Sequence, residues 1–186
     1  MISIESISFA YGEKNLLEDF SLNINKDSRI CIFGESGCGK TSLLRLILGL
    51  EKPQKGIIRR DGAPRPSVVF QENRLLPFKT VLQNIILIGA EEKTALKHLK
   101  ALGLENAADC RPSKLSGGMQ RRAALARALC ADCDYLVLDE PFTGLDEANT
   151  AAAARHISES LSGRALILVT HSKAEAQMLG ADIITL

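Results

Sequence analysis

Tryptophan is absent from this sequence of 186 residues, and only two tyrosines and six phenylalanines are present. Aromatic rings on which a base could stack are therefore scarce. An excess of one charge is also missing, because 23 basic and 22 acidic residues leave a formal net charge of +1. This balance provides no general attraction for nucleic acid or for an anionic membrane surface, so we expect no nucleic-acid partner.

Long apolar runs are missing as well. No stretch approaches the roughly 18 residues needed to cross a bilayer, and residues 1–5 lack the basic and apolar regions of a signal peptide. We therefore expect the protein to stay in the cytoplasm. A hydrophobic content of 46% predicts one compact domain with a substantial core.

Cysteine is present in an odd number, without the spacing of a disulfide framework: Cys31, Cys38, Cys110, Cys130 and Cys133. Reduced thiols are expected. Cys130 and Cys133 form a CxxC pair, for which a redox or metal role is the alternative. Because no second pair or histidine cluster accompanies it, we interpret this pair as incidental.

The first third of the sequence alternates between strands and turns. Residues 2–9 and 20–24 alternate apolar and polar side chains, which predicts two antiparallel strands. We assign the turn between them to Gly12, Glu13, Lys14 and Asn15. The sequence then predicts a buried strand over 29–33, a helix over 40–50, and short strands over 56–60 and 67–70.

Helical periodicity follows from residue 80 to about residue 103. Thr80 and Gln83 have the spacing of a capping box, and one apolar stripe contains Ala95, Leu96, Leu99 and Leu102. We expect residues 71–129 to form a mainly helical subdomain. It would be inserted into an α/β core made of about 1–70 and 130–186.

The last part of the sequence alternates strands with helices. Strands are predicted over 135–138, 165–170 and 183–186, and helices over 146–161 and 173–179. Such alternation favours a parallel sheet. The predicted fold class is therefore α/β.

A phosphate-binding loop lies between the strand over 29–33 and the helix that follows. Its pattern is two glycines five positions apart before a lysine and a hydroxyl residue: Gly34, Glu35, Ser36, Gly37, Cys38, Gly39, Lys40 and Thr41, with Ser42 adjacent. Glycines let backbone N–H groups approach a phosphate, and the helix start favours negative charge. Lys40 is expected to reach the β and γ phosphates, and Thr41 to offer its hydroxyl to Mg²⁺.

Two further segments carry polar groups suited to this chemistry. Asp139 and Glu140 end the buried strand that begins at Tyr135. Ser116, Gly117 and Gly118 precede a predicted helix over 119–129, whose free N–H groups make a second anion-binding helix start.

In this order and at these distances, the three motifs resemble the ATPase subunit of ABC transporters. The stretch VVFQ at 68–71, followed by LLP at 75–77, is most similar to importers of nitrate, sulfonate or taurine-like solutes. The resemblance implies a P-loop NTPase core with a mainly parallel sheet, an N-terminal antiparallel β part and an inserted helical part.

The resemblance also implies a role for each matching residue. Asp139 would help to hold Mg²⁺, and Glu140 would be the general base. Gln71 would contact the metal and the attacking water, and His171 would contact the γ-phosphate. Tyr11 would face the adenine, and Asp146 would couple the two ATP sites. The segment that would meet the ATP of a partner subunit contains Ser116, Gly117, Gly118 and Gln120.

Simpler interpretations remain for several of these residues. Ser116 and Asp146 could be helix N-caps, in addition to any other role. Tyr11 could be a core or turn residue, and Asp139 with Glu140 could form an acidic cap. Ser172 stands where the family often has aspartate, and with Glu175 it could cap the next helix.

The function implied is an ATP-hydrolysing subunit, peripheral on the inner face of the cell membrane. It would form a head-to-tail dimer with a second copy or a paralogue around two Mg-ATP molecules. Its other partners would be a membrane permease and an extracytoplasmic solute-binding protein. The alternatives are an ABC-type ATPase of a soluble machine and, from a different class, a P-loop kinase.

Overall fold

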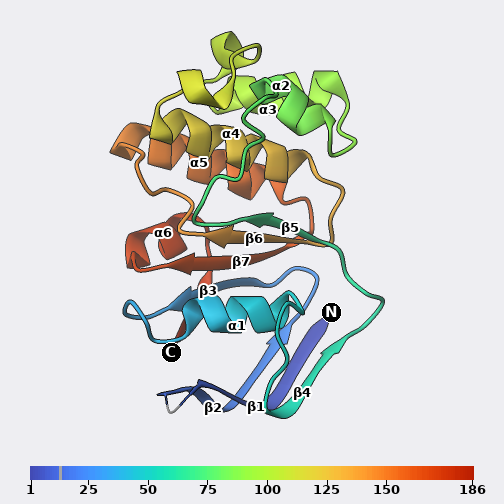
Figure 1. Ribbon diagram of the computed structural model, residues 1–186, viewed down its shortest axis with the longest axis vertical. Helices are drawn as coiled ribbons and strands as arrows, with labels where there is room; N and C mark the ends of the chain where they lie inside the picture. Colours follow the sequence, from blue (N-terminus) through green and yellow to red (C-terminus); the bar gives the residue numbers. More distant parts are fainter. Residues whose placement is uncertain (13) are drawn as a thin grey trace.

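A computed structural model describes residues 1–12 and 14–186 (Figure 1). A five-stranded sheet forms the middle layer, with strand order β5 (Pro66–Val69), β6 (Tyr135–Asp139), β7 (Ala165–Thr170), β3 (Arg29–Phe33) and β8 (Asp182–Thr185). All four neighbouring pairs are parallel. The predicted α/β class with a parallel sheet is therefore confirmed.

Alternating side chains of this sheet enter two separate cores. On β7, Leu166 and Leu168 pack with the helices on one face, whereas Ile167 and Val169 pack with the helix and the antiparallel sheet on the other. Every residue of β7 is buried. This burial on both faces explains the continuous apolar run from which the strand is predicted.

A three-stranded antiparallel sheet packs below, in the order β2 (Lys14–Ile24), β1 (Ile2–Tyr11) and β4 (Lys55–Arg60). The antiparallel opening is confirmed, but its turn is shorter than expected. Lys14 and Asn15 belong to β2, where they pair with Tyr11 and Ala10. Glu13, the remaining residue of the predicted turn, lies outside the described residues.

The helices cover the two faces of the parallel sheet. In Figure 1, α1 (Lys40–Ile47) lies between the two sheets, and α4 (Gly117–Cys130) with α5 (Glu147–Ser160) covers the opposite face. The last helix, α6 (Lys173–Met178), precedes β8. Two expected boundaries change: α1 ends at Ile47 before Gly49 turns the chain with a φ of 73°, and α4 starts two residues earlier than predicted.

The helical stretch predicted over residues 80–103 is divided into two helices. The chain forms α2 (Val81–Ile86) and α3 (Glu92–Ala101), and Gly89 turns the connection with a φ of 86°. The predicted capping box of Thr80 and Gln83 is confirmed. Within the predicted stripe Leu96 is 40% exposed, because its place on α3 faces away from the core that buries Ala95, Leu99 and Leu102. Single turns of 3₁₀ helix at Glu105–Ala107 and Pro112–Lys114 lead from α3 to α4.

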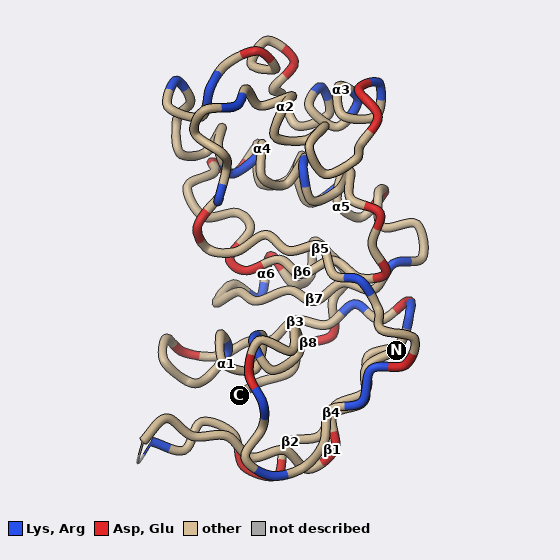
Figure 2. Tube along the Cα trace, turned by 45° about the vertical axis from the view of Figure 1, so that its right-hand side comes forward, with Lys and Arg blue, Asp and Glu red and all other residues tan. Residues whose placement is uncertain are grey.

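No helix in the described ranges has the length and apolar character to cross a membrane. Figure 2 shows that basic and acidic residues are interspersed along the trace.

Candidate active site

The carboxyl ends of β3, β6 and β7 meet at a cavity of about 760 Å³, which is where an open parallel sheet presents ligand-binding groups. The cavity brings together residues that lie far apart in the sequence. Those singled out from the sequence include Tyr11, Lys40, Thr41, Asp139, Glu140 and His171. Ser36, Gly37, Gly39, Ser42 and Gln71 also line it.

The glycine-rich loop between β3 and α1 forms one wall of this cavity. Gly39 is the N-cap of α1 with a φ of 110°, a left-handed conformation that favours glycine. A Cβ there would lie 3.3 Å from both the Cβ and the carbonyl oxygen of Leu16. No side chain among the described residues caps the start of α1, so its positive end is available to an anion.

Lys40, the first residue of α1, is folded over this loop. Its Nζ donates hydrogen bonds to the carbonyl oxygens of Gly34, at 2.7 Å, and Glu35, at 2.8 Å. The ammonium is thus held at the mouth of the loop by neutral acceptors, which a phosphate oxygen would replace with a charged one.

The two carboxylates at the end of β6 have different surroundings. Burial, and next the nearby Glu140, raise the pKa of Asp139. Glu140 has a φ of 48°, and its Oε1 lies 3.0 Å from Nδ1 of His171. This hydrogen bond is the main cause of the raised pKa of His171, whose ring is largely exposed. The backbone turn therefore pairs Glu140 with His171 and leaves Asp139 facing the wall next to α1.

Oxygen ligands for a divalent cation gather on that wall. Thr41, Gln71 and Asp139 line both the main cavity and an adjoining cavity of about 460 Å³. No hydrogen bond from the described residues engages the Asp139 carboxylate. A hydroxyl, an amide oxygen and a carboxylate that accepts no hydrogen bond from the described residues fit Mg²⁺, which takes few protein oxygens and shares the substrate phosphates.

Tyr11 lies at the end of β1, at the edge of the main cavity. Its hydroxyl donates to Glu51, its ring packs edge-on against Phe9 at 5.0 Å, and it is 48% exposed. Arg45 also donates to Glu51, at 3.2 Å. These contacts fix Tyr11 at the turn after β1, and its side chain also lines the cavity.

Ser116, Gly117 and Gly118 do not line this cavity. The N-cap interpretation of Ser116 is confirmed, since its Oγ accepts from Met119 N at 3.2 Å. Gln120 ties down the preceding loop by donating to the carbonyls of Pro112 and Leu115. The structure therefore separates the helix start of α4 from the helix start of α1 within one chain.

The two glycines at the start of α4 have different neighbours. A Cβ on Gly118 would lie 2.8 Å from the carbonyl oxygen of Gly144, whereas a Cβ on Gly117 would meet nothing within 4 Å. Gly118 is therefore required by packing against the loop before α5. Asp146 caps α5 by accepting from Asn149 N at 2.8 Å, which confirms the N-cap interpretation of that residue.

Two charged residues, Lys14 and Arg121, contact the site although the sequence pattern predicts no role for them there. Lys14 lines the main cavity and donates to the Gly37 carbonyl at 3.1 Å. Arg121 is 2% exposed and contacts the backbone around both carboxylates. An arginine within the buried, alanine-rich face of a helix is a signal that could have identified it.

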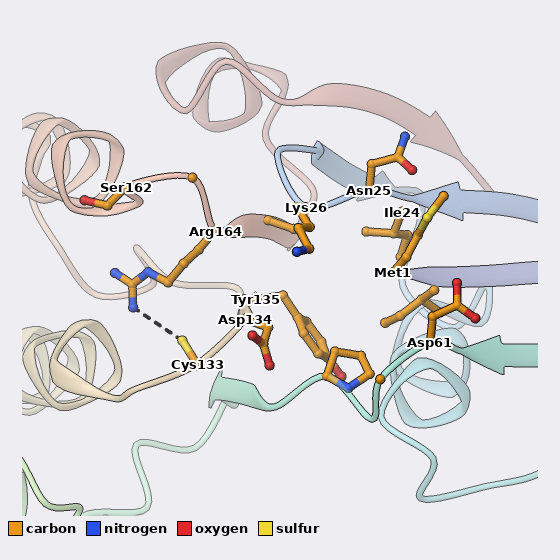
Figure 3. A pocket seen from close by; sticks show the side chains of 15 residues that line it. Met1, Ile24, Asn25, Lys26, Asp61, Cys133, Asp134, Tyr135, Ser162 and Arg164 are labelled. Atoms are coloured by element: carbon orange, nitrogen blue, oxygen red, sulfur yellow. Dashed lines mark hydrogen bonds between the residues drawn. The ribbon is translucent and has the colours of Figure 1, made fainter.

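A third cavity, of about 320 Å³, lies at the amino ends of β6 and β7 (Figure 3). Arg164 donates to Cys133 Sγ at 3.3 Å there, and burial raises the pKa of Cys130 to about 11. All five thiols are free. In the described part of the chain, no three His, Cys, Asp or Glu side chains are placed to share a metal ion.

Comparison with known proteins identifies a family of ATP-binding subunits, which is consistent with the phosphate-binding loop that lines the main cavity. Residues 17–143 match the ABC transporter family. The chain is 40% identical to the aliphatic sulfonates import ATP-binding protein SsuB 2 of Paraburkholderia xenovorans, over 100% of this chain and 76% of that protein. It is 34% identical to the taurine import ATP-binding protein TauB of Pseudomonas aeruginosa, over 100% of this chain and 78% of that protein.

A solved structure gives the same result. The dimeric post-hydrolysis state of the ATP-binding cassette MJ0796, bound to ADP and Pi, superposes with a TM-score of 0.87 at 29% identity. The match covers 100% of this chain and 94% of that one. The chain belongs to the ABC transporter family, as one of its ATP-binding and ATP-hydrolysing subunits.

Proposed function

We propose that this subunit works as one half of a head-to-tail pair, which closes around two Mg-ATP molecules and powers solute import through a separate membrane permease. The observation that carries the proposal is the convergence of Lys40, Asp139, Glu140 and His171 on one cavity, with Ser116 and Gly117 outside it. The sulfonate and taurine importers among its relatives favour small sulfonated solutes as the cargo.

Each group of the cavity has a chemical task in hydrolysis. Lys40 exchanges its bonds to the loop carbonyls for oxygens of the β and γ phosphates, aided by loop N–H groups and the start of α1. Glu140 accepts the proton of the attacking water, and His171, hydrogen-bonded to it, contacts the γ-phosphate. Tyr11 offers its exposed ring to the adenine.

Thr41, Asp139 and Gln71 would hold Mg²⁺ together with phosphate oxygens. The cation would offset the negative charge of the phosphates during transfer. Gln71 would also orient the attacking water, since it lines the same cavity as the two carboxylates.

The second copy supplies what the cavity of one chain lacks. The start of α4 is an anion-binding helix end whose Gly117 has open space on its outer side. In the pair, Ser116, Gly117 and Gly118 face the γ-phosphate held by the partner's Lys40, and Asp146 joins the two sites. Gln120 supports this element by fixing the loop before it.

The permease is expected to dock next to Gln71. Five apolar side chains between residues 76 and 88 are more than a third exposed: Leu76, Phe78, Ile86, Leu87 and Ile88. A cluster of this kind on one segment is typical of a protein interface. The occupant we propose is an apolar cytoplasmic segment of the permease, and residues 71–129 would form the helical subdomain that presents this apolar surface.

In this arrangement the subunit would lie on the inner face of the cell membrane, and an extracytoplasmic binding protein would deliver the solute.

The proposal is tested first on nucleotide binding. Lys40→Ala should lower the affinity for Mg-ATP by more than about tenfold, since a charge-assisted contact contributes about 1.5–3 kcal/mol. Isothermal titration calorimetry on the wild-type and variant proteins measures the change. Lys79→Ala, on an exposed residue outside the cavity, is the control. Equal affinities of the wild type and Lys40→Ala would refute the assignment of the loop.

A further inference from the structure

Arg121 is a buried cation on α4 without a carboxylate as hydrogen-bond partner among the described residues. The side chain is 2% exposed, and all its acceptors are neutral oxygens of two other segments. Burial lowers its pKa, while Asp139 and then Glu140 oppose that effect. Burying such a charge is costly, so its contacts must be well made.

One set of contacts reaches the turn that carries the carboxylates. Nε donates to the Pro141 carbonyl at 3.1 Å, and Nη2 donates to the carbonyls of Asp139 and Glu140, the latter at 2.6 Å. Glu140 has the left-handed φ of 48°, which a non-glycine residue keeps only when its surroundings hold it. Glu140 N also donates to the Val169 carbonyl at 2.8 Å, and Thr143 N donates to the Glu140 carbonyl at 3.3 Å, so Arg121 is one of several contacts that hold this residue.

The other set reaches the end of β5 and the segment that follows it. Nη1 donates to the carbonyls of Phe70 and Gln71, the latter at 3.4 Å, and to Asn73 Oδ1 at 3.3 Å. The rigid fork of the guanidinium thus joins β5 to β6 beyond Val69 and Leu138, the last residues that pair between these two strands.

We infer that Arg121 is a positioning residue for hydrolysis. From α4, whose N-cap is Ser116, its side chain holds the backbone of Asp139, Glu140 and Gln71 in place. The inference rests on the proposed function of these three side chains. Arg121 itself points to main-chain oxygens and does not line the nucleotide cavity. Its loss should therefore affect the rate of hydrolysis and leave the groups that bind ATP in place.

The test separates turnover from binding. Arg121→Lys keeps the charge and much of the volume but replaces the five-donor fork with one ammonium. We expect kcat to fall on the order of 10- to 100-fold, the scale of a small misplacement of a catalytic group, with the Kd for Mg-ATP within about threefold of wild type. Calorimetry in the presence of EDTA and ATP checks the binding of nucleotide without the metal.

Arg122→Lys is the matched control on the next position of the same helix. Arg122 donates to the carbonyls of Leu102 and Gly103, away from the carboxylates. An unchanged kcat in a folded Arg121→Lys protein would overturn the inference. So would a joint loss of kcat, ATP affinity and thermal stability, because that result describes a structural residue only.

Arg121→Gln serves as a second variant, in case the lysine fails to fold. It is neutral and keeps a planar donor, so it should retain part of kcat and the full ATP affinity. Wild-type protein that neither binds nor hydrolyses ATP would refute the proposed function. An active wild type with insensitive Arg121 variants would refute this inference alone.

Discussion

The two glycine-rich helix starts of this chain have similar local chemistry and opposite surroundings. Gly39 opens α1 without a side-chain cap, and its loop faces a cavity lined by Asp139, Glu140 and His171. Ser116 opens α4 with a side-chain cap, and that helix start lies outside the cavity. Both helix starts favour an anion, but in the described chain only the first lies in a cavity lined by charged side chains from several elements.

An anion-binding helix start can act only where an anion is brought to it. Gly118 packs against Gly144, whereas a Cβ on Gly117 would meet no atom of the described residues within 4 Å. Packing alone thus accounts for one glycine and leaves the other unexplained. The pairing proposal explains Gly117, because close approach of a partner's phosphate requires a residue without a side chain.

Removing the proton acceptor Glu140 should produce the largest effect on hydrolysis, and it should change only the cavity at the start of α1. Glu140→Gln is expected to lower the rate of ATP hydrolysis by about 10²- to 10⁴-fold, since the amide cannot accept the proton. ATP affinity should be retained, because the phosphate loop is unchanged. Phosphate release under saturating Mg-ATP measures the rate. Hydrolysis at the wild-type rate would remove Glu140 from its proposed role.

Adding one methyl group to each α4 glycine should separate packing from pairing. Gly118→Ala places a Cβ against the Gly144 carbonyl, so unfolding should become easier by about 1–3 kcal/mol. Gly117→Ala should leave stability unchanged or slightly higher, because alanine favours a helix, but should reduce hydrolysis on the order of tenfold. Urea unfolding and steady-state assays of the matched pair test this. Full activity in Gly117→Ala would mean that the open face has no ligand.

A smaller effect is expected far from both helix starts, where α3 meets α5. His98 Nδ1 lies 2.9 Å from His156 Nε2, and burial, followed by His156, lowers the pKa of His98 to about 4. Lys97 and Arg164 add to this lowering, and Glu159 opposes it at His156. Below pH 6.5 the unfolded chain therefore binds a proton that the folded chain does not.

The stability contributed by the neutral pair should be complete above about pH 6.5 and be lost as the pH falls toward 4. We expect about 1–2 kcal/mol over this window. His98→Gln should flatten that part of the pH profile of unfolding, and Lys100→Gln, on an exposed residue of the same helix, should not. A wild-type profile in His98→Gln would assign the slope to other groups.

How much the sequence predicts depends on how local the determining interactions are. The bounds of β3 and β7 are predicted to the residue, because strands buried on both faces are continuous apolar runs. The first half of β2 is missed, since register shifts in its pairing with β1 interrupt the alternation. The break between α2 and α3 depends on one left-handed glycine, Gly89, which periodicity does not detect.

The same distinction applies to the site. The loop at 34–41 is a contiguous motif, and its position after a buried strand indicates its place at the sheet edge. Arg121 shows the opposite case, because its acceptors lie 18 to 51 residues away along the chain and all but Asn73 Oδ1 are backbone oxygens. Contacts with main-chain atoms leave no pattern of residue types, so only the folded chain reveals them.

The central claim is that the start of α4 completes the site of a partner chain. The most direct measurement is the mass of Glu140→Gln in solution, by light scattering after gel filtration, with and without millimolar Mg-ATP. We predict a monomer without nucleotide and a dimer with Mg-ATP, and a monomer in both conditions when Lys40→Ala is added. A Glu140→Gln protein that binds ATP with intact affinity and stays monomeric would contradict the claim.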